Sequence, residues 1–69
     1  MKRKGWRGSE RVGYNRTIGP LSLGVWCANG RWWFAVNGGA SASAKSPEGA
    51  AAKAELKAAK LFAKWLAAT

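Results

Sequence analysis

An Asn-Gly pair between two apolar, aromatic-rich runs constrains this chain more than any other feature. The pair is Asn29-Gly30, and it separates residues 21–28 from residues 31–36. A two-residue type I′ turn requires a positive φ at both central positions, which Asn and Gly tolerate. The sequence therefore predicts a β-hairpin that turns at these two residues.

The register of this hairpin assigns its side chains to two faces. We expect Trp26 opposite Trp33 and Val25 opposite Phe34, and side chains alternate across a strand. The face expected to form the core carries Leu21, Leu23, Val25, Cys27, Trp32, Phe34 and Val36. The other face carries Ser22, Gly24, Trp26, Ala28, Arg31, Trp33 and Ala35. This second face places two tryptophans beside an arginine, so its role is the central functional question.

A third strand is predicted after Asn37-Gly38-Gly39, because residues 40–44 alternate between Ala and Ser. A two-residue loop would point the serines toward the core. A three-residue loop with a glycine in the left-handed conformation would instead pair Phe34 with Ala42 and point the alanines inward. We prefer the second register, in which small side chains also let a helix lie close to the sheet.

The C-terminal third of the sequence predicts a helix. Ser46 suits the N-cap, Pro47 suits the first helical position, and Glu48 favours the positive end of the helix dipole. The expected apolar face consists of Ala51, Ala54, Ala58, Leu61, Phe62, Trp65 and Leu66. A separate basic stripe consists of Lys53, Lys57, Lys60 and Lys64, and either is simply solvated or forms a secondary binding surface. Glu55 lies near the edge of the apolar face, so we expect it to be structural.

Residues 1–12 are basic and rich in glycine, which predicts a flexible arm before a single domain over residues 13–69. Residues 14–18 could add a short edge strand that Gly19-Pro20 would end. The expected fold is α+β: a three-stranded antiparallel β-meander packed against one C-terminal α-helix, behind a flexible basic N-terminal arm. Two alternatives concern the tryptophan face. It could form a homodimer, or residues 1–20 could cover it through Val12, Tyr14 and Ile18.

The charge balance restricts the function. Twelve Lys and Arg oppose three acids, which gives a net charge of +9 and a pI near 10.7. Such an excess indicates a polyanionic partner, a membrane surface or an acidic protein. The chain has no His and no Asp, so we expect no enzyme, no metal site and no cofactor. No segment approaches the roughly 20 apolar residues of a membrane span, and we expect a cytoplasmic protein.

The single cysteine, Cys27, excludes an internal disulfide, and its predicted position makes it an ordinary buried thiol. The candidate binding residues are therefore the cations and the tryptophans. Phosphate contacts are assigned to Lys2, Arg3, Lys4, Arg7, Arg11 and Arg16, and sheet contacts to Trp26, Arg31 and Trp33.

Three short runs carry a resemblance to a known module: residues 24–26 (Gly-Val-Trp), residues 31–38, and residues 46–51, which begin Ser-Pro-Glu. Together they resemble the three-stranded-sheet-plus-helix DNA-binding domain of plant ethylene-response factors and the arm-binding domains of phage integrases. The resemblance covers about residues 13–66. It implies a sheet that enters the major groove, where Arg and Trp side chains touch bases and backbone while the helix braces the back. A second likeness is to the last two strands and helix of double-stranded-RNA-binding domains.

These observations predict a small, non-enzymatic nucleic-acid-binding protein of phage or mobile-element type. We expect duplex DNA as its preferred partner, no membrane partner, and a monomer or weak homodimer. The main alternative is a phage-encoded inhibitor that binds an acidic surface of a host protein complex, in defence or transcription. An assembly protein that oligomerises through the tryptophans and a membrane-surface protein that binds through its helix are further alternatives.

Overall fold

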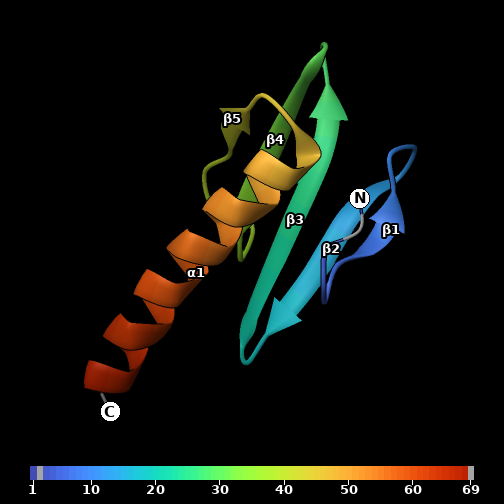
Figure 1. Cartoon of the computed structure of the whole chain (residues 1–69). Helices are drawn as coiled ribbons and strands as arrows, with labels where there is room; N and C mark the ends of the chain where they lie inside the picture. Colours follow the sequence, from blue (N-terminus) through green and yellow to red (C-terminus); the bar gives the residue numbers. More distant parts are fainter. Residues whose placement is uncertain (2, 69) are drawn as a thin grey trace.

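The computed structural model describes residues 1 and 3–68, and for residues 65, 67 and 68 it describes the backbone only. Within this part of the chain, five antiparallel strands form one sheet in the order β1-β2-β3-β4-β5, and a helix crosses one face of it (Figure 1). The elements are β1 (Arg7–Ser9), β2 (Gly13–Ile18), β3 (Leu21–Ala28), β4 (Arg31–Val36), β5 (Ala42–Ala44) and α1 (Pro47–Ala68). The predicted α+β class is confirmed.

The expected number of strands was too small, because the N-terminal segment adds two strands to the sheet. β2 pairs with β3 from Tyr14↔Val25 to Ile18↔Leu21, and β1 pairs with β2. On the side away from β4, the backbone N–H and C=O groups of β3 need hydrogen-bond partners, and β2 provides them. Part of the predicted flexible arm is therefore strand, and Trp6 just before it is only 9% exposed.

The central hairpin forms as its turn residues predict. Asn29 and Gly30 have φ values of 53° and 72°, and Trp26 pairs with Trp33. Both φ values lie in the left-handed region that a type I′ turn requires. The register of the longest strand pair is thus fixed by two residues at its tip.

The register predicted for the last strand is also confirmed. Phe34 pairs with Ala42, and Asn37 and Gly38 both have positive φ values, of 54° and 69°. The inward-facing alanines do not both reach the core, however. Ala44 packs against it, but Ala42 is exposed.

Alanines let α1 lie close to the sheet. Gly49 donates its backbone N–H to the Ser46 side-chain oxygen at 3.0 Å, which caps the start of the helix. Four alanines are at most 1% exposed, and they face a core that includes the fully buried Leu23 and Val25. The four are Ala50, Ala51, Ala54 and Ala58.

The C-terminal half of the predicted apolar helix face packs less than expected. Phe62 lies against the core, but Leu61 is 38% exposed and Leu66 is 52% exposed. The side chain of Trp65, assigned to the same face, lies outside the described part of the structure. A helix of 22 residues is about 33 Å long, and its last turns lead away from the strands (Figure 1).

Cys27 is exposed, which corrects its predicted burial. It pairs with Trp32 on the helix side of the sheet. However, β2 flanks β3 only as far as Val25, so the end of β3 that carries the thiol has a neighbouring strand on the β4 side alone.

Candidate nucleic-acid interface

The sheet presents one face to α1 and the opposite face, called here the outer face, away from it. Paired residues in antiparallel strands share a face, so the register places Trp26 and Trp33 on the outer face. Arg7 joins this face through its partner Asn15. The outer face comprises Arg7, Ser9, Asn15, Thr17, Ser22, Gly24, Trp26, Ala28, Arg31, Trp33, Ala35 and Ser43.

No described element covers the two outer tryptophans. Both are half-buried, and the N-terminal segment docks on the other side of the sheet, where Arg3 and Trp6 bond to Glu55. Tyr14 and Ile18, which were considered as a cover, instead pack on the helix-side core, where the Tyr14 and Trp32 rings lie 6.1 Å apart. The alternative in which residues 1–20 cover the tryptophans is therefore wrong for the part of the segment that the structure describes.

Both indoles are held in place by the backbone around them. Trp33 donates its Nε1–H to the Ala28 carbonyl oxygen at 3.1 Å, which ties the ring to the end of the hairpin. The Trp26 ring lies near Gly24, where an added Cβ would come within 3.9 Å of Cζ3. The Trp33 ring is thus fixed by a hydrogen bond, and ordering it for binding costs little side-chain entropy.

A shallow hollow of about 470 Å³ lies beside Trp26. Gly24 and Ala35 pair with each other there, and their small size leaves the space open. Polar side chains at its rim belong to Asn15, Ser22 and Ser41. The outer face therefore offers an aromatic surface next to hydrogen-bonding groups.

Arginines stand at two edges of the outer face. Arg7 lies on the edge strand β1, and Arg31 begins β4 beside the hairpin turn. Both are exposed, as are Lys4 and Arg11 in the turns around β1. Lys2, the remaining cation assigned to the arm, lies outside the described residues.

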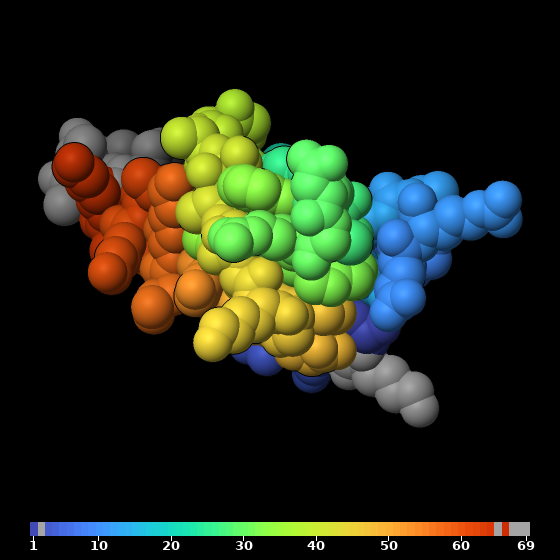
Figure 2. Space-filling view, turned by 90° about the horizontal axis from the view of Figure 1, so that it is seen from above, coloured from blue at the N-terminus to red at the C-terminus, as the bar shows by residue number. Residues whose placement is uncertain are grey.

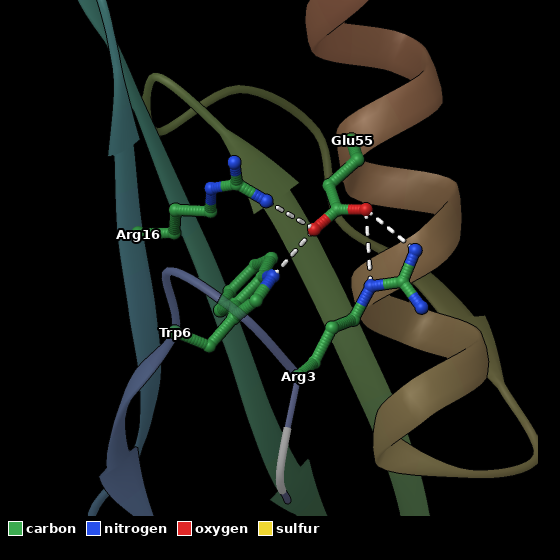
Figure 3. Close-up of polar contacts among 4 residues, drawn as sticks. All are labelled: Arg3, Trp6, Arg16 and Glu55. Carbon is green, nitrogen blue, oxygen red and sulfur yellow. Dashed lines mark hydrogen bonds and ion pairs between the residues drawn. The ribbon is translucent and has the colours of Figure 1, made fainter.

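Two of the predicted phosphate contacts are instead bound to a glutamate on the helix side (Figure 3). Arg3 Nη2 lies 2.6 Å from Glu55 Oε1, and Arg16 Nη1 lies 2.6 Å from Glu55 Oε2. Trp6 donates its Nε1–H to the same Oε2 at 2.7 Å. Glu55 therefore joins β2 and the segment before β1 to the middle of α1, in the structural role expected for it.

The hydrogen bonds that Glu55 accepts lower its pKa to about 2. The bond from Arg3 contributes most, and Trp6 and Arg16 act in the same direction, while burial opposes them. The carboxylate is consequently charged at any physiological pH, and it engages two guanidinium groups at once while offsetting one of their two charges. Those two cations differ from Arg7 and Arg31, for which the described part of the chain contains no ion pair.

The four lysines of the helix stripe are all exposed, namely Lys53, Lys57, Lys60 and Lys64. Sequence reasoning missed a further cation, Lys45, which is exposed between β5 and α1. The predicted pairing of Phe34 with Ala42 could have located it, because the same register pairs Trp32 with Ala44 and places the next residue along beside Arg31. Arg31, Lys45 and Lys53 line a common pocket.

The described residues contain no group of three or more His, Cys, Asp or Glu side chains that could hold a metal ion. They also contain no helix with the length and apolar character needed to cross a membrane. Comparison of the chain with protein-family models, curated proteins and solved structures found no match.

Proposed function

We propose that this protein binds nucleic acid, with a preference for duplex DNA, through the outer face of its sheet. The observation that carries the proposal is the cross-strand pair Trp26 and Trp33 on the face of the sheet opposite α1. A net charge of +9 supplies the attraction to a polyanion. The protein acts as a binding module without a catalytic step.

The distribution of acidic residues supports a polyanionic partner. Glu10 lies in the turn between β1 and β2, whereas Glu48 and Glu55 lie on α1. None of these three glutamates occupies a paired strand position of the outer face, so those positions carry arginines and no carboxylate. An antiparallel strand pair also has the dimensions to enter the major groove.

The outer tryptophans and the cations of the chain have distinct expected roles. Arg7 and Arg31 contact phosphates or guanine edges, and the two indoles pack on sugars or bases. Lys4 and Arg11 extend the phosphate contacts beyond β1. Arg3 and Arg16 position the N-terminal segment through Glu55, and they do not serve as primary phosphate contacts.

The test measures affinity for a fluorescent duplex by anisotropy at several salt concentrations. The wild-type affinity should fall steeply with salt, by about −0.9 in slope for each phosphate neutralised. The double variant W26A/W33A should weaken binding by about tenfold, since the lost apolar contact of each indole with the duplex should cost on the order of 1 kcal/mol. Leu56→Ala is the matched control, because Leu56 is 62% exposed on α1 and away from the outer face.

Folding of each variant is checked by circular dichroism before its affinity is interpreted. A salt-independent wild-type affinity, or an equal loss in L56A and W26A/W33A, would contradict the proposal. Absence of duplex binding, together with nuclease-resistant capture of one stoichiometric acidic host protein, would favour the inhibitor alternative instead.

A further inference from the structure

A second basic site lies at the corner where the β3–β4 hairpin, β5 and the start of α1 meet. This corner pocket has a volume of about 690 Å³. In the view from above, the green hairpin residues lie directly against the yellow and orange segment that leads into the helix (Figure 2). The side chains that matter here are Arg31 from β4, Lys45 from the β5–α1 connection and Lys53 from α1.

All three charged residues that line the corner pocket are cations. Each is exposed, and the two ion pairs recorded in the described part of the chain both involve Glu55 on another part of the surface. Glu48, the acid nearest in sequence, is exposed and is not among the lining residues. Three cations of like charge around one hollow repel one another, and an anion placed among them relieves that repulsion.

Side chains provide most of this attraction, because the helix start is already capped. The Gly49 N–H is bonded to the Ser46 side-chain oxygen, and the Ala50 N–H is bonded to the Ser46 carbonyl oxygen. A flexible lysine ammonium with three donors suits a phosphate oxygen as a point charge.

The corner pocket is continuous with the outer face through Arg31. This residue pairs with Ala28, whose carbonyl oxygen accepts the Trp33 indole N–H. A nucleic-acid backbone that runs over Trp33 and past Arg31 therefore arrives at Lys45 and Lys53 on the far side of the hairpin end.

We propose that the corner pocket binds a backbone phosphate of the same nucleic acid that lies on the outer face. This inference rests on the proposed function and deepens it. It assigns the path of the bound strand, which passes the end of the β3–β4 hairpin next to β5. It also divides the lysine stripe. Lys53 belongs to the binding site, whereas Lys60 and Lys64 remain solvated.

The test compares two double variants that remove the same charge. K45Q/K53Q neutralises the corner pocket, and K60Q/K64Q neutralises two exposed lysines farther along α1. Duplex affinity is measured against salt concentration for both variants and for the wild type. K45Q/K53Q should reduce the magnitude of the salt slope by about 0.9, because the one phosphate contact in the corner pocket is lost, while K60Q/K64Q should leave it nearly unchanged.

Each outcome separates this inference from the proposed function. If K45Q/K53Q binds like the wild type while W26A/W33A loses affinity, the outer face stands and the corner pocket is overturned. Equal changes in the two lysine pairs would also overturn it, because they would indicate only general attraction by a positive surface. A wild type that binds no duplex at low salt would remove the proposed function, and this inference with it.

Discussion

The arginines on the two faces of the sheet differ in their partners. On the helix side, Arg3 and Arg16 are bound to Glu55, and the surrounding core is closed by alanines that are at most 1% exposed. On the outer face, Arg7 and Arg31 are exposed beside two half-buried indoles. The other exposed cations of the helix side are therefore lysines, since Glu55 engages the two arginines there.

The comparison is sharpest between two arginines four residues apart. Arg3 lies before β1 and is bonded to α1, whereas Arg7 begins β1 and points to the other face. In the sequence alone, both belong to the same basic N-terminal segment, and both were assigned to phosphate contacts. Strand pairing and one distant glutamate give them different roles.

Removing a buried side chain from the helix side should have the largest effect. Leu23 is 1% exposed, and L23A should lower the free energy of unfolding by about 3 kcal/mol, because truncation leaves a cavity. S22A changes the neighbouring residue, whose side chain is on the outer face. It should change the free energy of unfolding by less than about 0.5 kcal/mol. Urea denaturation followed by circular dichroism measures both, and equal losses would break the distinction between the two faces.

Removing the charge of Glu55 should have the next largest effect. E55Q should lower the free energy of unfolding by about 1–2 kcal/mol, because three partners lose a charged acceptor in a partly exposed site. E48Q is the control, since Glu48 is exposed and only favours the helix dipole. If E48Q were as destabilising as E55Q, the contacts of Glu55 would contribute nothing specific.

Acidification should gradually remove the stabilisation that the Glu55 carboxylate provides. The folded-state pKa of Glu55, about 2, lies below its ordinary value of 4.5, so its stabilising effect is fully present above pH 4.5. It should be lost as the pH falls from 4.5 toward 2. Thermal unfolding of wild type and E55Q across this range should show their difference shrinking as the pH falls, and a constant difference would count against the assignment.

The smallest expected effect concerns single arginines in duplex binding. R7Q should reduce the magnitude of the salt slope by about 0.9, whereas R3Q should leave it unchanged, because Arg3 is already bound to Glu55. Anisotropy titrations at several salt concentrations provide the measurement. Identical slopes for the two variants would show that the faces do not differ in their use for binding.

Local turn chemistry made the central part of the fold predictable. Asn29-Gly30 set the register of β3 with β4, and that register placed Trp26 opposite Trp33 on the outer face. The loop at Asn37-Gly38 likewise gave the correct pairing of β5. In each case a few adjacent residues decide the geometry, so no knowledge of distant contacts is needed.

The N-terminal segment was not predictable in the same way. Its composition cannot form a core alone, but Trp6 gains burial against the rest of the domain and bonds to Glu55, 49 residues away. The Gly19-Pro20 turn could have fixed the register Ile18↔Leu21, and hence placed Arg16 on the same face as Tyr14. Applying the alternation rule to β2 would thus have removed Arg16 from the candidate phosphate contacts.

The bond between Trp6 and Glu55 also has a consequence for how the chain folds during synthesis. Every strand pairs with its neighbour in sequence, so the sheet can assemble progressively as the polypeptide leaves the ribosome. Trp6 cannot meet its carboxylate partner until the middle of α1 has been translated. The Trp6 indole is therefore synthesised well before its partner carboxylate, and this bond between residues 49 positions apart can form only once α1 is available.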